Sequence, residues 1–189
     1  MTRIRKAPQE RTTEILQTAK NLFDMFGYQH VSMADIGQAS SLARSSLYEY
    51  FASKEEIALS LLAGLAAPFE TIEIHGKKLE KRLTNLIEDT IQVAIEKSNL
   101  LALFYGAYPG LDETGRNKAS EWQRVVLNAF HQIFQDEKKL RFSAPKAAYF
   151  SLALVLQRIN DMAFSKATIN PAEEGELMST FIVKGMDRS

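Results

Sequence analysis

Apolar residues along most of this chain recur at steps of three and four residues, and no run alternates apolar and polar residues long enough to predict a strand. This period is typical of α-helices with one apolar face. The first stripe consists of Ile15, Leu16, Ala19, Leu22, Phe23 and Phe26. It ends before Gly27, a residue type that often follows the last turn of a helix. The pattern therefore predicts an all-α protein whose first helix covers about residues 8–26.

Two short helices are predicted next. Ser32 is followed three residues later by Asp35, a capping pattern that opens a helix through Ser40, and a further helix covers residues 44–51. Residues 41–43 form the turn between them, so that the pair matches a helix-turn-helix unit. The positions expected to face the interior of this unit are Ile36, Ala39, Leu42 and Leu47.

The remaining sequence predicts further helices. Ser53 and Glu56 repeat the capping signature and start a fourth helix, which we expect to continue through a bend near Pro68. Apolar stripes then predict helices over residues 79–94, 100–108 and 122–134, with a turn at residues 112–115. Two last helices begin after the predicted caps Ser143 and Asn170.

The composition narrows the range of functions. The chain has 189 residues with a net charge of +0 and no cysteine, which excludes a disulfide framework and favours the cytoplasm. Its longest uncharged runs, residues 57–69 and 98–111, are shorter than the ~18 residues that cross a bilayer, so no membrane association is expected. The N-terminus carries Arg3, Arg5, Lys6 and Arg11 against Glu10 alone, a local positive excess.

Enzymatic chemistry is not favoured. The three histidines are scattered and none forms a Glu-x-x-His pair, so a di-metal carboxylate site in a helical bundle is disfavoured. The absence of cysteine removes zinc fingers and thiol nucleophiles, and glycines are too sparse for a phosphate-binding loop. We therefore expect no catalytic residues, no bound metal and no cofactor.

The predicted third helix leaves a polar surface facing outward, made of Arg44, Ser45, Ser46, Glu49 and Tyr50. The second helix of a helix-turn-helix lies in the DNA major groove, where arginine pairs with guanine and serine hydroxyls donate or accept. Helical bundles without a DNA function also expose such surfaces. Spacing alone leaves both interpretations open.

The segment EILQTAKNLFDMFGYQHVSMADIGQASSLARSSLYEYFASKEEIALSLL resembles the DNA-binding region of tetracycline-repressor (TetR) family regulators over about residues 11–62. The resemblance implies a homodimeric repressor with a helix-turn-helix DNA-binding domain at residues 1–52 and a ligand-binding and dimerisation domain at 53–189. In the family, the positions of Arg44, Ser45 and Ser46 read bases. The positions of Ser32, Tyr48 and Lys54 contact the DNA backbone.

Three residues depart from the family's pattern. Ser41 replaces a common turn glycine, and in a left-handed conformation it would cost on the order of 1 kcal/mol unless the Ser40 and Ser41 hydroxyls compensate locally. Ala43 lacks the usual hydroxyl cap of the recognition helix. Glu49 stands where a phosphate-tolerant residue is usual, so it either accepts from a cytosine amino group or faces solvent, paired with Arg44 or Lys54.

Residues 100–189 contain eleven aromatic side chains, more than one small core needs. We expect some of them to line a cavity for an apolar or aromatic effector, first Phe104, Trp122 and Phe150. Tyr105, His131 and Gln157 are the candidate polar anchors. Ordinary packing at helical spacing is the alternative for each residue.

The last two predicted helices have broad apolar faces that favour pairing with a second copy of the chain. These faces consist of Ala148, Leu152, Val155, Leu156, Ile159, Leu177, Met178, Phe181 and Ile182. A twofold dimer would place two recognition helices on palindromic half-sites of double-stranded DNA, and an effector that moves the fourth helix would change their separation. The alternative is a helix-turn-helix architectural or protein-interaction module that senses no small molecule.

Overall fold

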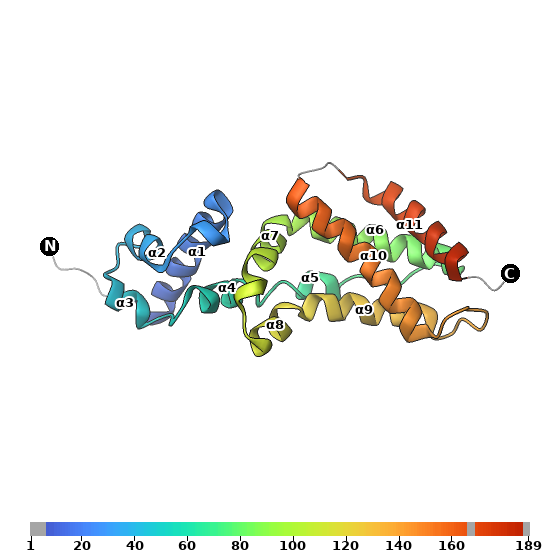
Figure 1. Ribbon diagram of the computed structural model, residues 1–189, viewed down its shortest axis with the longest axis horizontal. Coiled ribbons are helices and arrows are strands. Elements are labelled where there is room, and N and C mark those ends of the chain that lie inside the picture. The colour runs from blue at the N-terminus through green and yellow to red at the C-terminus, as the bar shows by residue number, and fades with distance from the viewer. Residues whose placement is uncertain (1–6, 166–168, 187–189) are drawn as a thin grey trace. The chain divides into compact units, whose positions relative to one another are not determined.

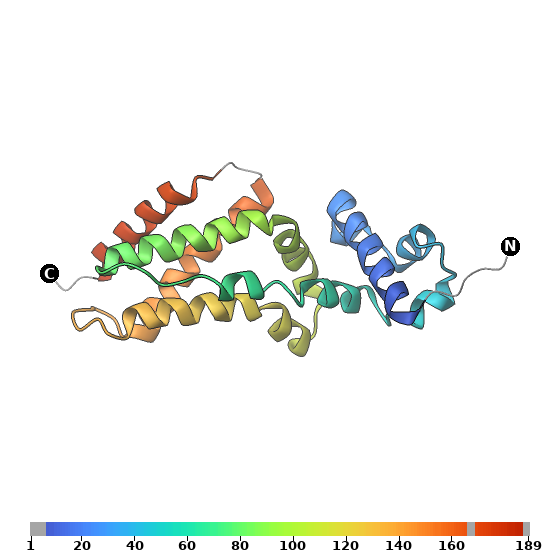
Figure 2. The same ribbon diagram turned by 180° about the vertical axis from the view of Figure 1, so that it is seen from behind.

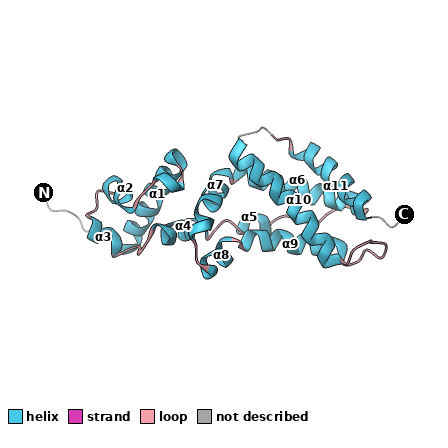
Figure 3. Cartoon of the chain, viewed as in Figure 1, coloured by secondary structure: helices cyan, strands magenta, loops and turns pink. Residues whose placement is uncertain are grey.

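The computed structural model describes residues 7–165 and 169–186, and these form helices and connecting loops without a strand (Figures 1 and 3). The all-α prediction is confirmed. The chain divides into two compact units, the first made of residues 1–63 and 99–119 and the second of residues 64–98 and 120–189. The chain passes from one unit to the other after Ala63, Ser98 and Ala119. The expected division of roles between residues 1–52 and 53–189 stays a prediction.

The first unit contains α1 to α4, most of α7, and α8. Its elements are α1 (Pro8–Phe26), the 3-10 turn η1 (Tyr28–His30), α2 (Met33–Ala39), α3 (Arg44–Tyr48), α4 (Lys54–Leu62), α7 (Ser98–Ala107), the 3-10 turn η2 (Tyr108–Gly110) and α8 (Glu113–Ala119). The apolar stripe of α1 buries Ile15, Ala19 and Phe23, and α1 packs against α2 and α4. Its last residue, Phe26, is exposed.

The helix-turn-helix is built largely as predicted. A capping box starts α2, because the Ser32 amide donates to the Asp35 carboxylate at 2.8 Å and the Asp35 amide donates to the Ser32 hydroxyl at 3.3 Å. Ile36 and Leu47 are fully buried as expected. Ala39 is exposed, which corrects its prediction, because α2 ends at this residue. Leu42 is half-buried.

The predicted continuation of the fourth helix past Pro68 is wrong. α4 starts at the predicted cap, where the Ser53 hydroxyl accepts from the Glu56 amide at 3.1 Å, but it ends at Leu62. Proline has no N–H to donate to the carbonyl of Gly64, so Pro68 instead occupies the first turn of the separate α5 (Ala67–Glu70). α4 also lies entirely within the first unit, so it is not the shared element that we expected.

Residues 112–115 do not form the predicted turn. The Asp112 carboxylate accepts from the Gly115 amide at 2.7 Å and so acts at the start of α8. Gly115 is buried with Leu59 of α4 nearby, and the Gln29 side chain donates to the Gly106 carbonyl of α7 at 2.6 Å. These contacts join residues 99–119 to the N-terminal helices.

The second unit is a packed group of long helices. It contains α5, α6 (Leu79–Glu96), α9 (Glu121–Phe134), α10 (Ala144–Ser165) and α11 (Pro171–Met186). α6 runs along α11, α10 packs on α9, and α6 also contacts both α9 and α10 (Figure 2). The fully buried side chains between them include Leu83, Leu86, Ile87, Ile91, Trp122, Phe130 and Phe134. Inside this core the Thr84 and Ser179 hydroxyls are hydrogen-bonded at 2.7 Å.

Candidate nucleic-acid interface

A groove of about 650 Å³ lies in the first unit between the starts of α2 and α4 and one side of α3. It brings together Ser32, Arg44, Tyr48 and Lys54, four of the residues predicted to contact DNA. The other residues that line it are Gln29, His30, Val31, Met33, Ala34, Ala52, Ser53 and Glu55. Segments from three helices therefore meet at one concave surface.

The outer surface of α3 carries the predicted base-reading set. Arg44, Ser45 and Glu49 are exposed, whereas Ser46 and Tyr50 are half-buried. The Arg44 guanidinium carbon lies 5.7 Å from the centroid of the Tyr48 ring, and Tyr48 is itself exposed. The negative face of an aromatic ring attracts a cation. This contact orients Arg44 at the start of the helix, next to the groove.

The turn before α3 shows the departures noted in the sequence. Ser41 has φ 54°, the only positive φ of a non-glycine residue in the described part of the chain. The expected compensation by Ser40 does not occur, because its buried hydroxyl has no hydrogen-bond partner among the described residues. Ala43 occupies the N-cap of α3 without a side-chain hydrogen bond. The chain therefore enters α3 through a strained residue and without a polar cap.

Lys54 is less available than the sequence suggested. Its ammonium donates to the Tyr28 carbonyl at 3.0 Å and lies 4.1 Å from the centroid of the Tyr28 ring. The side chain is half-buried in this position. Lys54 therefore faces the groove while it also ties the start of α4 to η1.

Glu55 and Tyr28 form a polar pair beside this lysine. The Tyr28 hydroxyl donates to the Glu55 carboxylate at 3.1 Å. Burial raises the pKa of Tyr28 above its ordinary value, and the negative charge of Glu55 raises it further. Burial also raises the pKa of Glu55, but its backbone amide and the hydroxyls of Tyr28 and Ser53 outweigh this effect, so that the pKa lies below its ordinary value. Glu55 therefore carries its negative charge at neutral pH.

The other charged residues considered for DNA contact differ in their ion pairs. Glu49 makes no ion pair with any described residue, so the predicted pairing with Arg44 or Lys54 is not found. Arg11 is paired with Glu14 at 3.0 Å. Arg3, Arg5 and Lys6, the other cations of the basic N-terminus, lie outside the described residues.

The six predicted effector contacts differ widely in burial, and their role in effector binding stays a prediction. Trp122 is completely buried, and Phe104 is buried in α7, where it packs edge-on against Tyr105. Burial raises the pKa of Tyr105 to about 12. His131 is half-buried on α9. Phe150 and Gln157 are exposed on α10, because the buried side of that helix is formed by residues such as Ser151 and Val155.

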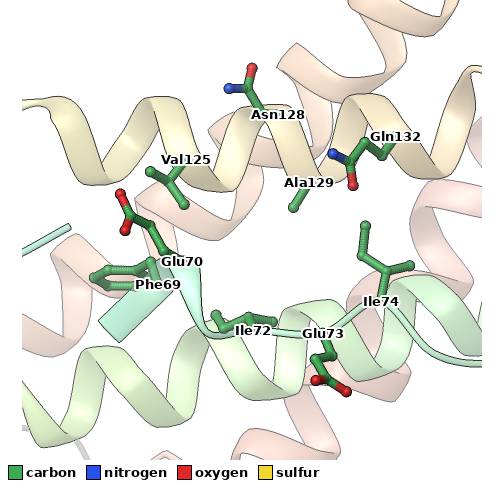
Figure 4. A pocket seen from close by; sticks show the side chains of 9 residues that line it. All are labelled: Phe69, Glu70, Ile72, Glu73, Ile74, Val125, Asn128, Ala129 and Gln132. Carbon is green, nitrogen blue, oxygen red and sulfur yellow. The ribbon is translucent and has the colours of Figure 1, made fainter. Parts of the chain in front are cut away.

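A groove of about 620 Å³ lies elsewhere in the second unit, between α9 and the segment from α5 to residue 74 (Figure 4). It is lined by Phe69, Glu70, Ile72, Glu73, Ile74, Val125, Asn128, Ala129 and Gln132. None of these was a predicted site residue. The alternation of Ile72 and Ile74 with polar neighbours, in a stretch between Pro68 and Gly76, is the signal that sequence reasoning passed over.

The predicted dimer surface also differs in detail. Ala148, Leu152, Val155, Ile159, Met178 and Ile182 are buried within the chain itself. Of the predicted set, Leu177 and Phe181 are exposed, at 67% and 69%, and Leu156 is half-buried. Tyr149 and Phe150 add further exposed aromatic area on α10, at 63% and 52%. The apolar surface left for a partner therefore keeps Leu177 and Phe181 of the predicted set on α11 and adds Tyr149 and Phe150 on α10.

Two features are absent from the described residues. No helix among them is long and apolar enough to cross a membrane. The histidine, aspartate and glutamate side chains among them do not form a group of three or more that could hold a metal ion.

Comparisons with known proteins agree with this architecture. A family model described as bacterial regulatory proteins, tetR family, matches residues 15–61. No curated protein is significantly similar in sequence to the chain. Among solved structures, NalD, the secondary repressor of the MexAB-OprM multidrug efflux pump in Pseudomonas aeruginosa, has a TM-score of 0.68 at 19% identity, covering 96% of this chain and 98% of its own.

Two further structures show the same likeness. FadR, a transcriptional regulator from Bacillus subtilis in complex with stearoyl-CoA, has a TM-score of 0.69 at 17% identity, covering 92% of this chain and 98% of its own. PfmR, a TetR family transcriptional regulator from Thermus thermophilus, has a TM-score of 0.67 at 23% identity, covering 93% and 96%. Residues 15–61 therefore match the tetR family of bacterial regulatory proteins, and the chain as a whole has the fold of these solved structures, one of which is a TetR family transcriptional regulator.

Proposed function

We propose that this protein is a dimeric, ligand-responsive, DNA-binding transcriptional regulator. We further propose that it is a repressor, released from a palindromic operator by a small, largely apolar or aromatic effector. The observation that carries the proposal is the groove of the first unit, where Ser32, Arg44, Tyr48 and Lys54 meet beside the exposed face of α3. The similar solved structures include a repressor and transcriptional regulators, which supports this role over an enzymatic one.

The contacts of this surface divide between bases and phosphates. Arg44, at the first position of α3 and exposed, is placed to pair with a guanine edge, with Ser45 and Ser46 beside it. Ser32 and Tyr48 carry hydroxyls at the groove, and Lys54 adds a positive charge, so these residues suit phosphate oxygens. Glu49 and Tyr50 follow on the same helix, and Glu49 is free to accept from a cytosine amino group.

Dimerisation is supported by the exposed apolar side chains of α10 and α11. Tyr149, Phe150, Leu177 and Phe181 are each more than half exposed, which is unusual for such large apolar residues unless a partner covers them. A twofold interface uses the same surface on both copies. Such a pair presents two α3 helices to two half-sites of one DNA duplex in the cytoplasm.

One observation favours a second candidate. Trp122 and Phe104 are packed in the interior as ordinary core residues, not exposed at the wall of a cavity. A helix-turn-helix architectural or protein-interaction module without small-molecule sensing would need no such cavity. The groove beside Phe69 favours the sensor, because it offers an alternative place for an effector.

The experiment that tests the regulator is the selection of bound DNA from a random pool by the purified full-length protein. We expect one palindromic sequence whose affinity falls steeply with salt, with a smaller salt slope after deletion of residues 1–6. Arg44→Ala should relax the base preference, whereas Lys54→Ala should weaken binding to all sequences alike. A coating pattern without sequence preference would support the architectural module, and no DNA binding at all would exclude the regulator and the architectural module and leave the protein-interaction module.

A further inference from the structure

Side chains of α6 contact both walls of the groove between α5 and α9. On α6, the buried Asn85 donates to the His75 carbonyl at 3.0 Å, and the Arg82 guanidinium lies 3.5 Å from the carbonyl oxygens of Gln132 and Ile133. Residues three apart on a helix share one face. One face of α6 therefore fixes both the loop after α5 and the last turn of α9.

The other end of the groove rests on an aromatic pair. The ring of Phe69, which lines the groove, lies 5.1 Å from that of the completely buried Trp122. Trp122 is the only tryptophan of the chain. Both ends of the groove are therefore in contact with side chains of the unit's interior.

The lining combines apolar side chains with negative charge. Phe69, Ile72, Ile74, Val125 and Ala129 provide the apolar surface, and Asn128 and Gln132 provide amides. Glu70 and Glu73 are the charged residues of the lining, and no arginine, lysine or histidine is among them. The nearby Arg82 is engaged with the carbonyls of α9.

Glu70 is the carboxylate that faces the groove. Figure 4 shows its side chain reaching toward α9 beside Val125, whereas the Glu73 side chain points away from α9. Glu70 makes no ion pair or side-chain hydrogen bond with any described residue. A carboxylate without a partner beside an apolar trough attracts a positive charge attached to an apolar body.

We propose that this groove is the effector site and that it binds a lipophilic monocation, such as an alkylammonium ion. The apolar part of the ligand lies against Ile72, Ile74 and Ala129, and its positive centre lies beside Glu70. Anionic amphiphiles with the same apolar body are rejected, because Glu70 repels their head group. This inference rests on the proposed function only in that the bound ligand acts as the effector. Binding to the groove itself does not require DNA.

The test compares two ligands with alkyl chains of nearly equal length and opposite charge. Dodecyltrimethylammonium and dodecanoate, each below its micelle concentration, are titrated into the full-length protein by calorimetry. We expect saturable binding of the cation, at least tenfold tighter than any binding of the anion. The fluorescence of Trp122 should change along the same titration, because Phe69 connects the groove to that ring.

Substitutions locate the site. Glu70→Gln should weaken the cation about fivefold, the usual size of an exposed charge pair, and Glu70→Lys should reverse the preference toward dodecanoate. Ala129→Phe should abolish both binding and the fluorescence change, by filling the groove. Glu176→Gln, an exposed acid on α11 outside this groove, is the matched control and should leave the affinity unchanged.

Glu70 is exposed, so its variants keep the inference testable even where Ala129→Phe fails to fold. Equal binding of the two ligands, or cation binding that neither Glu70 variant changes, overturns the inference. Selective DNA binding without cation binding overturns it while the proposed regulator stands. Cation binding at Glu70 by a protein that selects no DNA supports the site and removes the proposed function.

Discussion

The ammonium nitrogen of Lys54 lies 3.0 Å from the carbonyl oxygen of Tyr28 and 4.1 Å from the centroid of the Tyr28 ring. This relationship joins the first residue of α4 to the turn between α1 and α2, and the Tyr28 hydroxyl extends it to Glu55 at 3.1 Å. The residue proposed to hold a DNA phosphate therefore also stabilises the unit that presents α3. A phosphate contact made by Lys54 starts from a preorganised side chain, which reduces the entropy lost on binding.

Replacement of Lys54 by methionine should lower stability as well as DNA affinity. Methionine keeps the length of the side chain but loses the hydrogen bond and the cation–π contact, which together should cost about 1 kcal/mol of unfolding free energy. Urea unfolding measures this cost. Lys20→Met on α1 is the control, because it loses only the ion pair with Asp24. It should change the unfolding free energy by about 0.5 kcal/mol at most. Equal stability of the two variants would show that the Tyr28 contact contributes nothing.

Glycine at position 41 should stabilise the protein. Ser41 has φ 54°, where a Cβ atom is strained, and neither its own hydroxyl nor that of Ser40 is hydrogen-bonded among the described residues. We expect Ser41→Gly to raise the unfolding free energy by about 0.5–1 kcal/mol, measured by chemical denaturation. Gln135→Gly is the control, because Gln135 is exposed and its φ of −60° is one that any residue adopts, and it should not stabilise. A loss of stability in Ser41→Gly would contradict the strain.

The prediction of α2 and α11 from sequence succeeded because their starts depend on local chemistry. The Ser32–Asp35 capping box forms as expected. Asn170 accepts from the Ala172 amide at 3.2 Å, directly before Pro171 at the start of α11. Such signals involve residues within one turn of each other, so they can be recognised in the sequence without knowledge of the fold.

The features that sequence reasoning missed depend on neighbours far away in the chain. The apolar residues on both sides of Pro68 fit one stripe and so predict one helix, where the structure has the separate helices α4 and α5. The groove needs Phe69 and Ala129 side by side, which only the packing of α5 on α9 provides. Phe150 was chosen for its type, but its position on α10 directs it to the surface.

The capping box of α2 should make stability depend on pH through Asp35. The hydroxyl and amide of Ser32 lower the pKa of Asp35 in the folded protein. A lowered folded pKa contributes stability that is present above the unfolded value of about 3.9 and is lost as the pH falls through the folded pKa. Ser32→Ala should move the pKa of Asp35 back toward its ordinary value, as NMR titration of the carboxyl measures. Ser45→Ala, outside the box, should leave the titration unchanged; equal titrations in both variants would contradict this cause.

Gly175 and Gly185 lie on the same helix, α11, and should respond to alanine in opposite directions. A Cβ atom at position 175 would lie 2.9 Å from the Thr84 carbonyl oxygen and 3.3 Å from Glu88 Cβ, whereas none of the neighbouring atoms considered lies within 4 Å of one at position 185. Because a backbone carbonyl within α6 cannot move alone, Gly175→Ala must push the two helices apart.

We expect Gly175→Ala to lower the unfolding free energy by about 1–3 kcal/mol, since overpacking outweighs the gain in helix propensity. Gly185→Ala should raise it by up to about 1 kcal/mol, since it gains propensity without a clash. Chemical denaturation of both variants and of the double variant measures the two effects, which should add because the sites share no partner. Stabilisation by Gly175→Ala would mean that α6 and α11 pack less closely than this contact requires.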